Sequence, residues 1–246
     1  MEIYQLSKTP LLHYPFKKEV IASTLILKWI TMEEQNRLWY LKKFNLFETM
    51  TEEEMESLNE VVVDNEVKKK QPVYLAGDPS ENIYFLKEGR LKITRLDESG
   101  KEFTLTLLAP GEIFGELGLF DDSPRETSAV ALEDSIICMM RRNDFEKYTA
   151  QKPELSLKLS KLMGLRLRQI ENRIEELLFR DVPSRLARLL LRLVDLHPRE
   201  TKHGLRINIK LSQQELANLI GATREMTSSV LNSFRRDSII NIEYKY

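Results

Sequence analysis

The chain has 246 residues, of which 42% are hydrophobic and 30% charged, and this composition excludes a disordered protein and suits one or two packed domains. No apolar run reaches the roughly 18 residues of a membrane-spanning helix, and the single cysteine, Cys138, excludes an internal disulfide and a cysteine-ligated zinc or iron–sulfur site. The net charge of −1 is unevenly distributed: residues 180–246 carry 12 Lys and Arg against 7 Asp and Glu, whereas residues 1–179 carry 25 against 31. We therefore expect a cytoplasmic protein without a membrane partner. The uneven charge is compatible with chance, and it also suits nucleic acid that only the C-terminal part contacts.

The N-terminal stretch carries no recognisable pattern. Residues 1–31 show no amphipathic period, so we interpret them as a flexible extension, or as a stretch that precedes a translation start at Met32. Residues 32–41 predict a helix. Thr51 followed by three glutamates is typical of the capped start of a further helix.

Residues 66–140 consist of short runs of β-forming residues separated by turn signals such as Gly77-Asp78-Pro79. Strands that are this short and this close together predict an antiparallel sandwich or barrel. Within this region Phe103, Leu105 and Leu107 alternate with other residues, and we expect them to share one face of a strand.

Pro153 opens a long predicted helix that runs to about Phe179, because proline is tolerated in the first turn of a helix. One set of its apolar residues recurs at spacings of 4, 3, 4 and 3, the period of a coiled coil. A second stripe, which includes Leu155 and Leu159, can pack on the β-rich region. We therefore predict a homodimer whose interface consists of Met163, Leu167, Ile170, Ile174 and Leu177.

Two short helices joined by a glycine are predicted near the C-terminus. Ser212 and Glu215 form a capping box at the start of the first, Gly221 ends it, and Thr223 can cap the second. This spacing is typical of a helix-turn-helix, although a generic helical hairpin has a similar one.

The start of the second of these helices has a polar face. The first residues of a DNA-recognition helix meet base edges in the major groove, where arginine can pair with guanine and glutamate can accept from cytosine. Alternatively, Glu225 only complements the helix dipole. Away from this polar face, the apolar residues Met226, Val230 and Phe234 recur every four positions, with Leu231 beside them. The candidate DNA-binding residues are Ser212, Thr223, Arg224, Glu225, Ser228 and Ser229.

Two segments resemble the CRP/FNR superfamily of bacterial transcription regulators. The segment from Phe114 to Ala129 is similar to the phosphate-binding cassette of a cyclic-nucleotide-binding β-roll, and the segment from Leu211 to Ile240 is similar to the family's helix-turn-helix. The resemblance implies an α+β protein with an antiparallel β-roll, a long dimerisation helix and a C-terminal winged helix-turn-helix. The implied domains are an extension at 1–40, a sensor at 41–150, a dimerisation helix at 151–179 and a DNA-binding domain at 180–246.

The resemblance also implies an effector site in the cassette. In nucleotide-binding members the residue matching Arg125 holds the cyclic phosphate, and the one matching Glu116 takes the ribose 2′-hydroxyl. Glu126 stands where those members have Ser or Thr, and Ile170 stands where cyclic-AMP responders place a hydroxyl residue, which speaks against cyclic AMP in particular. Alternatively, Arg125 and Glu116 pair with each other in an empty pocket. The candidate effector-binding residues are Gly115, Glu116, Leu117, Arg125, Thr127 and Ile170.

These patterns together predict a homodimeric DNA-binding transcription regulator without enzymatic activity, since no nucleophile–base pair, metal cluster or phosphate-binding Walker loop is visible. We expect it to read an inverted-repeat operator, to contact RNA polymerase, to respond to a small effector such as a cyclic nucleotide, and to need no other cofactor. The alternative is a cyclic-nucleotide-sensing protein that acts through protein partners instead of DNA.

Overall fold

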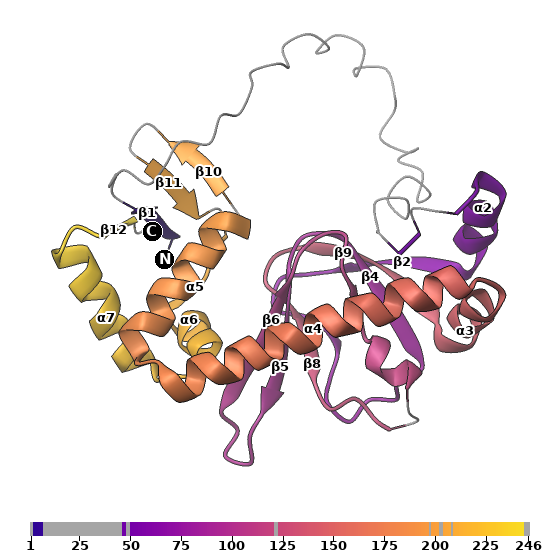
Figure 1. Ribbon diagram of the computed structural model, residues 1–246, viewed down its shortest axis with the longest axis horizontal. Helices are drawn as coiled ribbons and strands as arrows, with labels where there is room; N and C mark the ends of the chain where they lie inside the picture. The colour runs from indigo at the N-terminus through magenta and orange to yellow at the C-terminus, as the bar shows by residue number, and fades with distance from the viewer. Residues whose placement is uncertain are drawn as a thin grey trace, which may run out of the picture.

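The computed structural model describes residues 2–6, 46–47, 50–120, 123–196, 198–201, 204–207 and 209–243. Within these ranges the chain forms a β-rich part, a long helix that runs along it, and a C-terminal part that contains three helices (Figure 1). The predicted helix at 32–41 lies outside the described residues. The order of the parts confirms the predicted α+β architecture of β-roll, long helix and helix-turn-helix.

The β-rich part is a roll of two four-stranded antiparallel sheets. Their strands are short, as the closely spaced turn signals predicted. The first sheet has the order β2 (Val62–Val67), β9 (Ser135–Arg141), β4 (Asn82–Glu88) and β7 (Ile113–Phe114). The second has the order β3 (Pro72–Tyr74), β8 (Ser128–Ala131), β5 (Leu91–Leu96) and β6 (Glu102–Leu108).

Both sheets contribute to one core inside the roll. The rings of Tyr74 and Tyr84 stack with their centroids 5.6 Å apart, and those of Tyr84 and Phe114 stack at 5.2 Å. Such pairs contribute about 0.5–1.5 kcal/mol each beyond the burial of their surface. The aromatic rings therefore fill the space next to the turn that follows β7.

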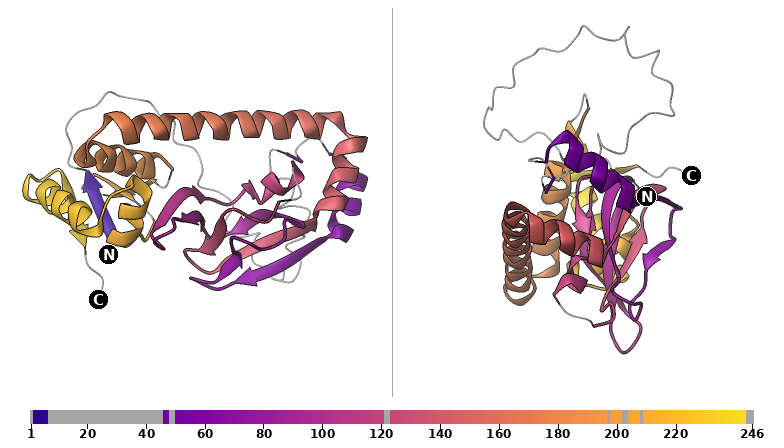
Figure 2. Two further views of the ribbon diagram at one scale, coloured as in Figure 1. Left: turned by 90° about the horizontal axis from the view of Figure 1, so that it is seen from below. Right: turned by 90° about the vertical axis from the view of Figure 1, so that its right-hand side faces the viewer.

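Among the described residues, three α-helices lie before the C-terminal part: α2 (Glu52–Val61), α3 (Arg142–Gln151) and α4 (Pro153–Phe179). Thr51 forms the predicted capping box at the start of α2. Helix α4 has the predicted bounds and runs along the roll from α3 to the C-terminal part, as the left view of Figure 2 shows. Leu155 and Leu159 are buried against the roll, as the second apolar stripe of this helix predicted.

The alternating residues of β6 do share a face, but it is the outer face of the roll. Thr104 and Leu108 are the buried residues of this strand, whereas Leu105 is 38% exposed. Leu107 packs against the core of the C-terminal part instead. The outer face of β6 is apolar because the C-terminal part covers it.

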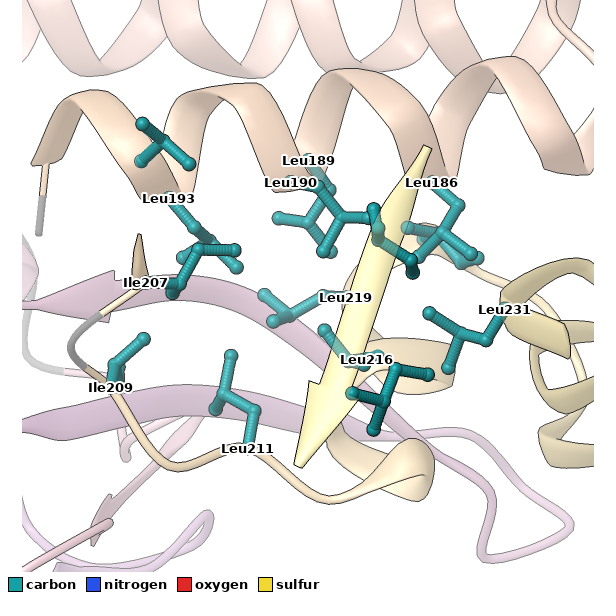
Figure 3. Close-up of a cluster of buried hydrophobic side chains, with 14 of the residues drawn as sticks. Leu186, Leu189, Leu190, Leu193, Ile207, Ile209, Leu211, Leu216, Leu219 and Leu231 are labelled. Atoms are coloured by element: carbon teal, nitrogen blue, oxygen red, sulfur yellow. The ribbon is translucent and has the colours of Figure 1, made fainter. Parts of the chain in front are cut away.

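The C-terminal part combines α5 (Val182–Leu196), α6 (Gln213–Ile220) and α7 (Arg224–Arg236) with strands β10 (Pro198–Thr201), β11 (Gly204–Ile207) and β12 (Ile240–Glu243). Leucines from all three helices meet in one buried cluster, which Figure 3 shows. Leu186, Leu216 and Leu231 are fully buried there. Replacing one such leucine by alanine typically costs about 2–5 kcal/mol, so this cluster fixes how the three helices pack.

The N-terminal stretch differs from the sequence-based expectation at one place. Residues Glu2–Leu6 form strand β1, which pairs with β11 on one side and with β12 on the other. The sheet of the C-terminal part therefore has the order β10, β11, β1, β12. Five residues are too few to show an amphipathic period, and partner strands far along the chain provide their hydrogen bonds.

Candidate functional site: an effector cassette and a DNA-reading helix

The cassette begins at a sharp turn after β7. Gly115 has φ of 75°, a left-handed conformation that favours glycine, and it precedes the 3-10 helix η1 (Glu116–Leu119). A Cβ atom on Gly115 would lie 2.8 Å from Nη1 of Arg125 and 3.0 Å from the ring of Tyr84. Glycine is therefore required here because the backbone approaches the arginine closely.

Arg125 lies inside the roll and is only 6% exposed. Its Nη1 donates to the carbonyl oxygen of Gly115 at 2.7 Å, and its Nη2 donates to the carbonyl oxygen of Asn82. The guanidinium carbon lies 4.5 Å from the ring centroid of Tyr74. Among the described residues its buried Nε has no hydrogen-bond partner, although such donors are usually paired.

Tyr74 and Tyr84 enclose this arginine. Burial raises the pKa of both phenols, while the charge of Arg125 opposes the shift. The Tyr74 hydroxyl also bonds with Thr127, one of the predicted effector residues. The two phenols therefore stay neutral at physiological pH. They do not neutralise the positive charge of Arg125.

Glu116 is 4% exposed, and its carboxylate pairs with Arg166 of α4. The guanidinium of Arg166 also donates to the carbonyl oxygen of Ile113. The alternative in which Glu116 and Arg125 pair with each other is therefore wrong, because each has partners of its own. Sequence reasoning missed Arg166, whose only signal was its place one helical turn before Ile170.

The remaining cassette candidates lie nearer the surface. Glu126 pairs with Arg95 at 3.4 Å, and both side chains are more than half exposed, so this carboxylate points away from the buried arginine. Leu117 is 64% exposed and Ile170, on α4, is 55% exposed. The structure thus brings Arg125 and Thr127 to Tyr74, and Gly115 to Arg125 and the Tyr84 ring. Leu117 and Ile170 are open to solvent.

The helix-turn-helix has the predicted caps. The Ser212 hydroxyl accepts from the backbone N–H of Glu215, whose carboxylate accepts from the backbone N–H of Ser212. Gly221 adopts the left-handed conformation that ends α6, and the Thr223 hydroxyl accepts from the backbone N–H of Met226. These caps fix the turn that aims α7.

The first turns of α7 present a polar face. Arg224, Glu225 and Ser229 are exposed and Ser228 is half-buried. Met226, on the apolar stripe, is 49% exposed, while Thr227 is fully buried. Thr227 can take the buried place because its hydroxyl donates to the carbonyl oxygen of Thr223 at 2.9 Å.

The predicted dimer residues of α4 fall into two groups. Leu167, Ile170 and Ile174 are all more than half exposed and follow one another along the helix. Met163 packs against the core of the roll, and Leu177 lies against the turn that contains Gly221. The exposed middle of this stripe is an apolar surface that is typical of a subunit interface.

The described ranges of the chain contain neither a metal cluster nor a membrane-spanning helix. No group of three or more His, Cys, Asp or Glu side chains in those ranges could hold a metal ion. None of the helices in the same ranges is long and apolar enough to cross a membrane.

Family models match two parts of the chain. Residues 64–152 match the cyclic nucleotide-binding domain and residues 184–246 match the Crp-like helix-turn-helix domain. The CRP-like cAMP-activated global transcriptional regulator of Mycobacterium tuberculosis is 35% identical over 173 residues, which cover 70% of this chain and 77% of that protein. A transcriptional regulator of the CRP/FNR family from Thermus thermophilus superposes with a TM-score of 0.62 and 26% identity, covering 74% of this chain and 90% of that one. The c-di-GMP responsive global regulator CLP of Xanthomonas campestris has the same fold, with a TM-score of 0.70 and 24% identity over 78% of this chain and 95% of that one.

Proposed function

The chain belongs to the CRP/FNR family of DNA-binding transcription regulators, and from this premise we propose that it acts as a homodimer that reads an inverted-repeat operator under the control of a small effector. In this proposal residues 41–150 form the sensor, 151–179 the dimerisation helix and 180–246 the DNA-binding domain. The protein acts in the cytoplasm by binding and not by catalysis, and RNA polymerase is the partner through which it changes transcription.

The exposed polar start of α7 is the observation that carries the DNA-reading role. Arg224 and Glu225 lie in the first turn, where a recognition helix meets base edges. Their side chains are exposed, while the opposite side of α7 packs into the leucine cluster through Leu231. The helix is thus rigidly held with its hydrogen-bonding side chains free, which suits reading bases better than packing on a protein partner.

Two such helices are needed to read an inverted repeat. The exposed residues Leu167, Ile170 and Ile174 of α4 support pairing with a second copy. In a symmetric dimer the two recognition helices would lie about 34 Å apart, so each would meet one half-site a helical turn from the other.

The effector proposal rests on Arg125. Its buried guanidinium, with a free Nε, suits an anionic ligand such as a nucleotide phosphate, and Gly115 allows the backbone to approach it. Glu126 does not repel such a ligand because it pairs with Arg95 at the surface. The relatives described above are named as responding to cyclic AMP and to cyclic di-GMP, so relatives differ in their ligands. Ile170 offers an adenine only apolar contact, and we propose a nucleotide-like effector for which cyclic AMP is a poor choice.

The DNA-reading role is tested by binding labelled duplexes while the salt concentration is varied. An operator is first obtained by selecting tight-binding duplexes from a random pool with the wild-type protein. We expect Arg224→Ala to weaken binding to that operator by about 1–3 kcal/mol and to leave binding to random duplex nearly unchanged, because a base contact carries the sequence preference.

Arg235→Ala is the matched control, because this exposed arginine lies in the last turn of the same helix. Any effect it has on phosphate contacts should weaken both duplexes equally. An equal loss on both duplexes for Arg224→Ala would overturn its base-reading role. Binding that does not weaken with salt would overturn the DNA-binding function and favour a protein partner.

A further inference from the structure

The sensor and the DNA-binding domain are joined by a polar contact between β6 and α6. The Oε1 atom of Glu102 accepts from Nζ of Lys92 at 2.6 Å and from Nδ2 of Asn218 at 2.8 Å. Asn218 belongs to α6 and is 6% exposed, and its own Oδ1 accepts from Gln214 at 2.8 Å. Charge-assisted bonds in such shielded positions are stronger than ordinary surface contacts.

Arg173 of α4 reinforces this contact from the other side. Its Nη1 donates to the carbonyl oxygen of Leu105 on β6 at 2.7 Å, and its Nη2 donates to that of Leu219 near the end of α6. Its guanidinium carbon lies 4.5 Å from the ring centroid of Phe103. Through Arg173, the long helix thus contacts both the sensor strand β6 and α6, the first helix of the helix-turn-helix.

The positive charge of Arg173 is favourable at the C-terminal end of α6. Carbonyl groups in the last turn of a helix lack intrahelical partners and carry the negative end of the helix dipole. Burial, followed by the positive charge of Arg192, lowers the pKa of Arg173 to about 10, so the side chain remains charged at neutral pH.

The turn between α6 and α7 is packed against the same surface. A Cβ atom on Gly221 would lie 3.0 Å from Cδ2 of Leu177 and 3.4 Å from Cε2 of Phe103. The turn that aims α7 therefore contacts both the long helix and the sensor strand. By contrast, only Arg180 and Asp181 connect α4 to α5 along the chain.

We propose that Arg173, together with the Glu102–Asn218 contact, is a positioning device that holds the recognition helix at a fixed orientation to the dimerisation helix. It acts through α6 and touches no DNA. Because a rigid orientation lowers the entropy lost when both helices of a dimer engage, the device strengthens binding to a two-half-site operator and hardly changes binding to one half-site. The inference rests on the proposed homodimer that reads an inverted repeat.

The test compares two duplexes, the selected operator and the same duplex with one half-site randomised. Arg173→Ala is expected to weaken binding to the full operator about tenfold and to change binding to the single half-site less than twofold, within the 5–150-fold range usual for coupling between sites. Arg173→Lys keeps the charge but cannot bridge both carbonyls in the same planar geometry, so it should recover only part of the loss. Arg188→Ala removes an exposed arginine of α5 that pairs with Glu176 at 3.8 Å, and it should behave as wild type on both duplexes.

A second variant tests the proposal independently, in case Arg173→Ala does not fold. Asn218→Asp conserves shape but places a carboxylate against Glu102, and it should show the same selective loss on the full operator. An equal loss on both duplexes, no loss on either, or tighter binding to the full operator would each overturn the proposal. If the wild-type protein itself shows no preference for the full operator over the half-site, the proposed dimeric function fails instead.

Discussion

At the scale of the residue, the cassette shows how charged groups are held inside a β-roll. Arg125 has two carbonyl acceptors and an aromatic face, and Glu116 has the guanidinium of Arg166. A buried charge that lost its partners would cost several kcal/mol, so these contacts hold both side chains in place. A ligand must therefore compete with, or add to, bonds that already exist.

The role of Arg125 can be measured with nucleotides directly. We expect calorimetry to show weak binding of cyclic AMP and cyclic GMP with little difference between them, because the apolar side chain of Ile170 cannot read the exocyclic group of either base. Arg125→Lys keeps the charge and loses the planar fork, and it should weaken whatever binding is seen by about tenfold, or roughly 1.4 kcal/mol.

Arg95→Lys is the control for that measurement, since Arg95 is exposed and pairs with the outward-pointing Glu126. It should leave nucleotide binding unchanged. Micromolar binding of cyclic AMP with strong preference over cyclic GMP would contradict the inference drawn from Ile170. Unchanged binding in Arg125→Lys would contradict the assignment of the pocket.

At the scale of the element, α4 has three surfaces: one packs on the roll, one contacts the helix-turn-helix, and one is exposed. Leu155 and Leu159 pack on the roll, Arg173 and Leu177 meet the helix-turn-helix, and an exposed apolar stripe lies between these contacts. A helix of 27 residues spans about 40 Å, which is long enough to keep these surfaces separate. The stripe is therefore free to bind a second copy without disturbing the packing inside one chain.

The stripe predicts how the dimer can be broken. Ile174→Glu places a charge in this apolar surface, where its burial in a dimer would cost several kcal/mol, so the variant should elute as a monomer in size-exclusion chromatography with light scattering. Its melting temperature should fall mainly through the lost association. Glu175→Gln, on the neighbouring exposed position, should remain a dimer; a dimeric Ile174→Glu protein would show that another surface holds the subunits together.

At the scale of the whole molecule, the two ends of the chain meet in one sheet. Strand β1 lies between β11 and β12, so the start of the chain takes part in the DNA-binding domain and not in the sensor that follows it in sequence. Together with the contact of β6 with α6, this arrangement places the reading helix between supports from distant parts of the chain.

Deleting residues 1–31 tests the role of β1. The truncated chain should still form dimers, because α4 is untouched, and its sensor strands should keep their protection. Strands β11 and β12 lose the bonds that they make with β1, so their amide hydrogens should exchange faster in mass spectrometry. Unchanged protection of β11 and β12 would support the original interpretation of this stretch as a dispensable extension.

The sequence by itself determined the local features of this protein. The bounds of α4, the caps at Thr51, Ser212 and Thr223, and the polar start of α7 follow from residues close together in the chain, because helix periodicity and capping depend on neighbours three or four positions away. Family resemblance added the order of the domains and the cassette.

Only the tertiary structure decided which surfaces meet. The alternation of Phe103, Leu105 and Leu107 showed that one face of a strand is apolar, but not that this face turns outward toward α6. The pairing of Glu116 with Arg166 and the bridging position of Arg173 likewise join residues far apart in sequence. Such contacts depend on how whole elements pack, and packing depends on the shape and charge of distant partners, which no local pattern encodes.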